Sequence, residues 1–196
     1  MAQELEFKYG LADSYHFDSL METLKKKFPG DWEKIKMETD YYDTWDRQLS
    51  AKRWTLRIRN EGGISVLACK TPGQGRARCE WEVTEGTLPD GLMALVRRGA
   101  PDELMDLYHI PMHAWCGARY SRYRKVIDLD GTKVELAMDR GVLMGRSKEL
   151  PLWEFEAELK EGDPEVLTRW CTQFAGEQHL REEPKSKFSR AMALSD

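Results

Sequence analysis

Charged and apolar side chains alternate along several stretches of this sequence. In residues 4–8, for example, Glu4, Glu6 and Lys8 are separated by single apolar residues. Successive side chains of a β-strand point to opposite faces of a sheet, so each such stretch is predicted to be a strand with one charged and one apolar face. The same alternation recurs in residues 56–59, 76–83, 122–124 and 153–159.

These charged faces have two interpretations. A half-buried antiparallel sheet with one solvated face gives the same alternation. Here, however, the charges are grouped by sign, with Arg57 two residues before Arg59 and Glu154 two residues before Glu156. Like charges that are neighbours on one strand face repel each other unless something bridges them. A polyanion with bound divalent cations would be such a bridge, so we favour a polar site lined by these faces.

Apolar residues at helical spacing predict three amphipathic helices, at residues 13–27, 89–98 and 163–175, and a shorter helix at 101–107. Asp130-Gly131 is the strongest hairpin signal, because both residues tolerate the positive φ angles of a tight turn. With the first strand, the remaining patterns predict about eight strands. The other seven cover residues 33–43, 54–59, 64–70, 76–84, 115–129, 132–139 and 151–160.

About eight antiparallel strands can close on themselves and so lose their edges. We therefore predict an α+β fold in which a closed eight-stranded antiparallel β-barrel forms a tunnel with a charged lumen. The amphipathic helices would flank the barrel and cover its apolar outer face. No break in composition separates domains, so residues 1–196 are predicted to form one domain.

Composition narrows the class of protein further. The net charge of −4 lacks the basic excess of a general nucleic-acid binder, so no nucleic-acid partner is expected. No apolar run approaches the length of a membrane span, and the first strand is not preceded by a signal segment. The four cysteines are widely spaced, as is typical of reduced thiols. We expect a cytoplasmic protein that does not enter a membrane.

The charged stretches also carry a family resemblance. Glu4-x-Glu6-x-Lys8 is similar to the ExExK signature of the CYTH superfamily, the triphosphate tunnel metalloenzymes. Further segments of the sequence resemble other motifs of that superfamily, in the same order along the chain, and together they cover nearly its whole length. They are Tyr41-Tyr42-Asp43-Thr44, Arg57-x-Arg59, Lys70, Arg78-x-Glu80, Arg122-x-Arg124, Glu135 to Asp139, Glu154-x-Glu156 and Ser186-Lys187-x-x-Arg190. ExExK alone is a weak signal, whereas the ordered set is specific.

The resemblance implies an eight-stranded tunnel and metal-dependent hydrolysis of a triphosphate, with the bacterial inorganic triphosphatases as the most similar members. It implies catalytic roles for Glu4, Glu6 and Lys8. It implies Mg²⁺ or Mn²⁺ as cofactor, bound by Glu4, Glu6, Asp139, Glu154 and Glu156. The phosphates would be held by Arg57, Arg59, Lys70, Arg78, Arg122, Arg124 and Lys187.

Three alternatives stay open at this point. Adenylate cyclases and thiamine-triphosphatases or nucleoside-triphosphatases use the same scaffold on other triphosphates. A polyphosphate-binding module without catalysis is a further alternative, although carboxylates without a metal would add nothing to an anion sensor. The expected partner is a small-molecule triphosphate, and the expected assembly is a monomer or a homodimer.

Overall fold

A single antiparallel sheet of nine strands organises the computed structural model, which describes residues 5–73, 78–84 and 87–195. The strands lie in the order β5-β4-β3-β2-β6-β7-β8-β1-β9. Their bounds are β1 Glu6–Gly10, β2 Glu33–Thr44, β3 Thr55–Glu61, β4 Ile64–Pro72, β5 Arg78–Val83, β6 Met112–Leu129, β7 Thr132–Met144, β8 Glu149–Glu161 and β9 Arg181–Glu182.

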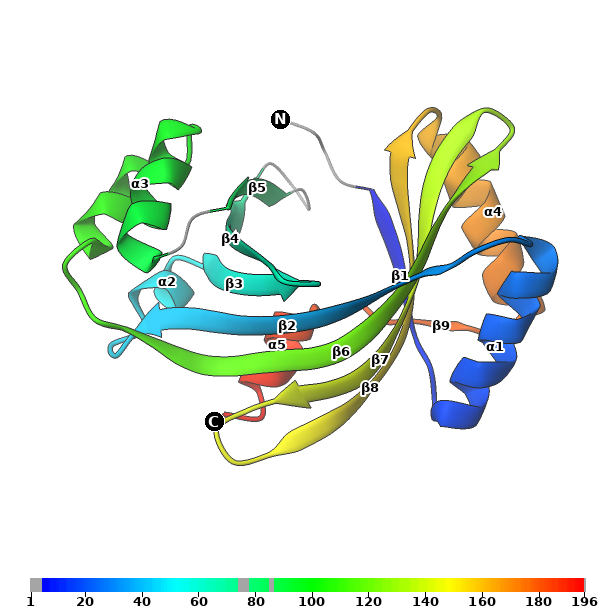
Figure 1. Cartoon of the computed structure of the whole chain (residues 1–196), viewed down its shortest axis with the longest axis horizontal. Coiled ribbons are helices and arrows are strands. Elements are labelled where there is room, and N and C mark those ends of the chain that lie inside the picture. Colours follow the sequence, from blue (N-terminus) through cyan, green and yellow to red (C-terminus); the bar gives the residue numbers. More distant parts are fainter. Residues whose placement is uncertain (1–4, 74–77, 85–86, 196) are drawn as a thin grey trace.

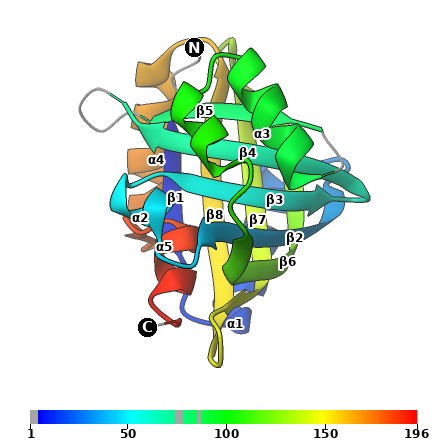
Figure 2. The ribbon, with the colours of Figure 1, turned by 90° about the vertical axis from the view of Figure 1, so that its left-hand side faces the viewer.

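The predicted closed eight-stranded barrel is wrong in two respects. The sheet has nine strands, and within the described residues no pairing joins β5 at one end of the order to β1 or β9 at the other. The free edge of β1 is instead occupied at Tyr9 and Gly10, which pair with β9. The sheet is strongly bent all the same, so that β3, β4 and β5 cross in front of β1, β7 and β8 at a steep angle (Figure 2).

The helices are α1 Ser14–Lys27, α2 Gln48–Ala51, α3 Leu88–Arg97, α4 Pro164–Glu177 and α5 Lys187–Met192, with a 3₁₀ helix, η1, at Asp102–Leu107. The three predicted amphipathic helices are confirmed as α1, α3 and α4. Each begins after a residue whose side-chain oxygen accepts a hydrogen bond from a backbone N–H of the first turn: Asp13, Thr87 and Asp163. The hairpin at Asp130-Gly131 is also confirmed, with φ angles of 50° and 81°.

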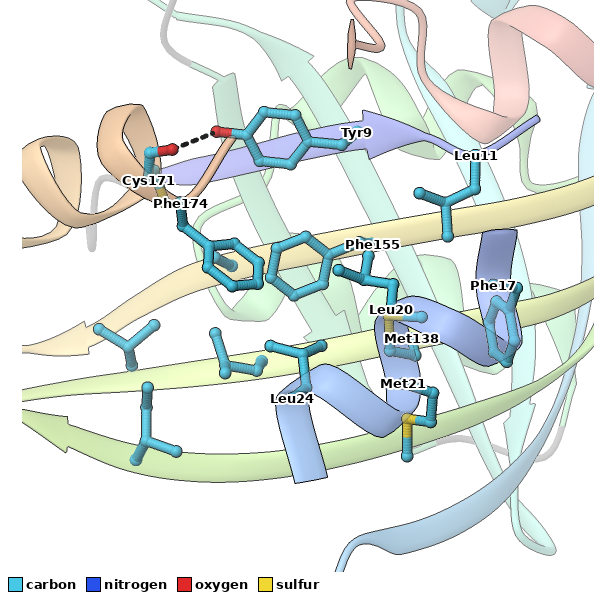
Figure 3. Packing of buried hydrophobic residues seen from close by; sticks show 14 of the residues in the cluster. Tyr9, Leu11, Phe17, Leu20, Met21, Leu24, Met138, Phe155, Cys171 and Phe174 are labelled. Atoms are coloured by element: carbon cyan, nitrogen blue, oxygen red, sulfur yellow. Dashed lines mark hydrogen bonds between the residues drawn. The ribbon is translucent and has the colours of Figure 1, made fainter. Parts of the chain in front are cut away.

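Helices cover the sheet at opposite ends of the molecule, α1 and α4 at one end and α3 at the other (Figure 1). An apolar cluster lies under the helices at each end. One lies between β1, β6, β7 and β8 and the helices α1 and α4, where Phe155 packs against Phe174 and Leu24 is fully buried (Figure 3). The other lies between β3, β4 and β5 and the helix α3, and includes Leu56, Leu67 and Leu95. The apolar faces predicted from the alternation are therefore buried under helices, which leaves the charged faces on the inside of the bend.

Helix α5 occupies a different place, because it packs on β6 and β7 within the bend. A third apolar cluster surrounds it, in which Phe188 contacts Tyr41 and Ala191 is fully buried. This part of the inner face is apolar, whereas the barrel prediction placed only charge there. Among the described residues, no helix is long and apolar enough to cross a bilayer.

Candidate active site

The charged strand faces line one large cavity of about 1260 Å³, here called the main cavity. Its walls come from strands on both sides of the bend and from the N-terminal turn of α5. Nine of the predicted site residues line it: Glu6, Lys8, Arg57, Arg59, Lys70, Arg122, Arg124, Glu156 and Lys187. The structure therefore brings together side chains that lie up to 181 residues apart in the sequence, between Glu6 and Lys187.

Four other predicted residues are placed differently. Asp139 and Glu154 do not line the main cavity and are fully buried behind its wall. Glu4 lies outside the described residues. Arg78 begins β5, but its side chain also lies outside what the structure describes.

Three carboxylates from neighbouring strands form a compact group, here called the carboxylate cluster: Asp139, Glu154 and Glu156. One oxygen from each lies within 4.8 Å of the others. The register of the sheet explains this, since Asp139 of β7 is directly opposite Glu154 of β8, and Glu156 follows two residues later on the same face. Three acidic groups this close and this deeply buried require positive charge beside them.

Lys187 and Arg122 supply much of that charge. The Lys187 ammonium group lies 2.9 Å from Asp139 and 2.6 Å from Glu156, and it also contacts Glu154. The Arg122 guanidinium group donates to both oxygens of Asp139, at 2.8 and 2.7 Å, and also to Glu156. A bidentate Arg–carboxylate pair fixes both side chains in orientation, so Asp139 is held rigidly at the base of the cluster.

Arg190 contributes the third cation. It contacts Glu154 and lies 3.6 Å from Glu183, one helical turn after Lys187 on α5. Ser186 begins this short helix, because its hydroxyl accepts a hydrogen bond from the Ser189 N–H. The C-terminal motif of the sequence is thus a helix that presents two cations to the carboxylate cluster.

The two glutamates of the cluster differ in their proton affinity. Burial raises the pKa of Glu154 to about 7, and the Glu156 charge adds to this, while Lys187 opposes it. Burial also acts to raise the pKa of Glu156, but Lys187 and Arg122 outweigh it and hold that pKa well below its ordinary value. Glu156 is therefore the charged member of the pair near neutral pH, and Glu154 is the member that takes up a proton first.

The opposite wall of the main cavity carries a second set of ion pairs. The Arg57 guanidinium group lies 3.0 Å from Glu80 and 3.1 Å from Glu82. Lys70 lies 2.7 Å from Glu80, and Arg59 lies 3.7 Å from Glu82. Arg59 also pairs with Glu61 of β3. The predicted cations of this wall are thus held in place by carboxylates of β5 and β3.

Three buried guanidinium nitrogens have no hydrogen-bond acceptor among the described residues, the Nε atoms of Arg57, Arg59 and Arg190. Arg57 and Arg59 line the main cavity, whereas Arg190 does not. A buried donor without an acceptor costs about 1–3 kcal/mol, so the Nε atoms of Arg57 and Arg59 are suited to an anionic ligand that enters the cavity. This is independent support for anion binding, because it does not depend on the motif that predicted these residues.

Sequence reasoning missed some residues of the main cavity. Tyr41 and Tyr120 line it, and Glu61 and Lys160 lie along its wall. Tyr120 could have been found from the alternation, since it is two residues before Arg122 on the same face of β6. Lys160 could have been found in the same way, since it is two residues after Glu158 in the row of charged residues on β8.

Comparison with known proteins places this geometry in a family. The CYTH domain matches residues 2–192. The chain belongs to the CYTH family. The chain is also 25% identical to the inorganic triphosphatase of Haemophilus influenzae. The alignment covers 99% of this chain and 55% of that relative. It therefore spans only about half the length of this curated relative.

Solved structures share the CYTH fold at lower identity. A candidate adenylyl cyclase from Hippeastrum, described as having a dominant triphosphatase activity, superposes with a TM-score of 0.67 at 18% identity, covering 100% of this chain and 97% of that one. A candidate adenylate cyclase from Bacillus halodurans superposes with a TM-score of 0.59 at 22% identity, covering 94% of each chain. At these identities the likeness concerns the fold.

Proposed function

We propose that this CYTH chain hydrolyses inorganic triphosphate (tripolyphosphate) to diphosphate and phosphate. The observation that carries the proposal is the main cavity, in which cations of two walls come together and one wall contains Glu156 of the carboxylate cluster, with Asp139 and Glu154 behind it. Hydrolysis of a phosphoanhydride depends mainly on positioning and on neutralising the charge of the phosphate oxygens. The name of the Haemophilus influenzae relative supports the same substrate.

In this proposal, the cations of the cavity bind the phosphates. Arg57 and Arg59 would hold phosphate oxygens with their planar forks, and Lys70 would act as a point charge. From the other wall Arg122, Arg124 and Lys187 would do the same, and Lys8 lies in the same cavity. Substrate oxygens would also accept from the buried Nε atoms of Arg57 and Arg59.

The carboxylate cluster fits a divalent metal ion in its donor chemistry. Asp139, Glu154 and Glu156 offer hard oxygen ligands within 4.8 Å of one another, which suits Mg²⁺ or Mn²⁺. Glu6 lines the same cavity and would complete the set, together with Glu4. When bound, a metal ion of this kind neutralises phosphate charge and lowers the pKa of an attacking water. In the structure the Lys187 ammonium group provides positive charge beside these three carboxylates. With a metal ion bound there, Lys187 would shift toward the phosphates.

Phosphate release from tripolyphosphate, measured with Mg²⁺ and with Mn²⁺, tests this function. We expect turnover that stops when the metal is chelated. Glu6→Gln and Glu156→Gln should each lower kcat/KM by about 100-fold, because each removes a charge that would hold the metal. Glu22→Gln, an exposed position on α1, is the matched control and should behave as wild type.

Other outcomes would point to the other functions. Cyclic AMP formed from ATP would indicate a cyclase, and preferred hydrolysis of thiamine triphosphate would indicate that substrate. Tight binding of tripolyphosphate without turnover at any metal concentration would favour a binding module. The single domain, the cytoplasmic location, the absence of a nucleic-acid partner and the monomeric or dimeric state stay predictions.

A further inference from the structure

The ammonium group of Lys187 lies among the three members of the carboxylate cluster and contacts one oxygen of each. These contacts are with Oδ2 of Asp139 at 2.9 Å, with Oε1 of Glu156 at 2.6 Å and with Oε1 of Glu154. One oxygen from each of the same carboxylates is also what a metal ion would bind at this place. The ion and the ammonium group would therefore compete for the same oxygens, because two cations at contact distance repel each other.

The two arginines of the carboxylate cluster contact a different set of oxygens. Arg122 donates to both oxygens of Asp139 and to Oε2 of Glu156. Arg190 contacts Oε2 of Glu154. A carboxylate oxygen has two lone pairs, so a carboxylate that accepts from an arginine can still bind a metal ion. Both arginines can therefore stay in place when an ion binds, whereas the lysine stands in its way.

Lys187 is also the cation whose side chain can leave the cluster without moving the sheet. It is the first residue of α5, a helix of six residues, whereas Arg122 lies within β6 directly opposite Asp139. A lysine is a point charge on a flexible four-carbon stem, so other oxygens can replace its partners. Its ammonium group lies 5.4 Å from the centre of the Tyr120 ring, which lines the main cavity. Lys187 lines that cavity as well, so its ammonium group can turn from the carboxylates to an anion there.

From this arrangement we propose that Lys187 is an internal competitor of the metal ion and so determines how tightly the carboxylate cluster binds it. The inference rests on the proposed function, because it takes the carboxylate cluster as the metal site. It deepens that function in one respect, since the ion would bind by displacing a cation of the chain itself. Lys187 would then have opposite effects on the two ligands: it would weaken binding of the metal ion and strengthen binding of the phosphates.

Binding of Mn²⁺ alone, measured by electron paramagnetic resonance of the free ion, tests the inference without turnover. Lys187→Met nearly keeps the length of the side chain and removes its charge, so the Kd for Mn²⁺ should fall by about tenfold or more. Lys187→Arg keeps the charge and should bind Mn²⁺ no more tightly than wild type. In kinetic assays, Lys187→Met should raise KM for tripolyphosphate, because a cation that holds the phosphates is lost.

Lys160→Met is the matched control, because it removes the same charge from the same cavity. Lys160 lines the main cavity, and among the described residues its ion pairs are with Glu158, at 2.8 Å, and Glu135, at 3.9 Å, outside the carboxylate cluster. The Kd of this variant for Mn²⁺ should differ from that of wild type by less than about threefold, since its charge acts on the ion only at a distance.

Acetylation of lysines, followed by mass spectrometry, tests the displacement in the wild type. The Lys187 side chain is 11% exposed and paired with three carboxylates, so it should react slowly. Mg²⁺ should raise its rate of acetylation severalfold, because the ion releases the ammonium group toward the main cavity. The rate at Lys160 should not change with Mg²⁺.

The outcomes separate this inference from the proposed function. Tighter Mn²⁺ binding by Lys187→Met together with a higher KM supports the inference, whereas a purely structural role of Lys187 would weaken both. If wild type and Lys187→Met bind Mn²⁺ alike, the inference is overturned while the metal site stands. If neither binds Mn²⁺, the inference and the metal site of the proposed function both fail. Should Lys187→Met not fold, acetylation of the wild type decides: a rate that Mg²⁺ raises supports the inference, and a constant rate overturns it.

Discussion

At the scale of single residues, the site depends on how buried charges are balanced. Glu154 and Glu156 come from the same strand and share Lys187, yet their pKa values move in opposite directions. Each also contacts an arginine of its own, Arg122 for Glu156 and Arg190 for Glu154. For Glu156 the cations outweigh burial, whereas for Glu154 burial and the Glu156 charge outweigh Lys187 and Arg190. A pattern of alternating glutamates does not distinguish the two.

The raised pKa of Glu154 predicts a pH dependence of stability. The ordinary pKa is 4.5 and the folded value is about 7, so the folded protein binds this proton more tightly than the unfolded chain does. Between pH 4.5 and 7 this group therefore lowers the free energy of unfolding as the pH rises, and its effect is constant above pH 7. Glu154→Gln should remove that contribution.

Urea unfolding in the presence of EDTA measures this effect. The free energy of unfolding of Glu154→Gln, minus that of wild type, should rise with pH between 4.5 and 7 and then level off. Glu22→Gln, at an exposed position, should show a difference that does not vary over this range. A flat difference for Glu154→Gln as well would mean that the proton is not held at Glu154.

At the scale of elements, the pairing of β6 with β7 sets the position of Arg122 relative to Asp139. Gly141 of β7 is directly opposite Tyr120 of β6 in this pairing. Gly141 is two residues from Asp139 along β7, and Tyr120 is two residues from Arg122 along β6. A Cβ atom at Gly141 would lie 2.1 Å from the Arg119 carbonyl oxygen and 2.5 Å from the Tyr120 Cα atom. The two strands can approach this closely only because residue 141 has no side chain.

Gly141→Ala should therefore lower the free energy of unfolding by about 2 kcal/mol, since rigid backbone atoms would have to move. Gly176→Ala is the matched control within α4, where, apart from the adjacent backbone of its own helix, a Cβ atom would meet no atom of the described chain within 4 Å. There the change should raise the free energy of unfolding by about 0.5–1 kcal/mol, because alanine loses less backbone entropy in a helix. Equal stability of the two variants in urea unfolding would contradict this account of the β6–β7 pairing.

At the scale of the whole molecule, the two walls of the main cavity are connected through the bend of the sheet, and no strand pairing in the described chain joins its two ends. Arg57 and Lys70 lie on one wall, and Arg122 and Lys187 on the other. A ligand with several phosphates would contact both walls at once. Its binding should then stabilise the fold as well as fill the site.

We expect tripolyphosphate, added in EDTA at about 100 times its Kd, to raise the free energy of unfolding by about 2.7 kcal/mol. For a chain of this size that corresponds to an increase in Tm of about 5 °C or more. Thermal unfolding measures it, with sulfate at equal ionic strength as control. The expectation fails if sulfate gives the same shift, or if Arg57→Ala does not reduce the shift with tripolyphosphate.

The sequence by itself determined the features that repeat over short distances. Alternation in strands and helical stripes such as Phe17, Leu20 and Leu24 predicted the elements, because neighbouring residues fix which face each side chain occupies. Of the thirteen site residues predicted from the charged faces and the ordered motifs, nine line the main cavity. Local patterns suffice for this, since they depend on the period of the backbone and not on the partner strand.

Only the tertiary structure decided how the faces meet. Among the described residues no pairing closes the sheet, and part of the edge of β1, at Tyr9 and Gly10, pairs with β9 instead. It buried Asp139 behind the cavity wall, because the register of β7 with β8 fixes its position. It placed Lys187 among the carboxylates, because α5 packs inside the bend of the sheet. It also brought Trp32 beside Arg124, although 92 residues separate them in the sequence. Long-range packing fixes these distances, and no short stretch of sequence contains them.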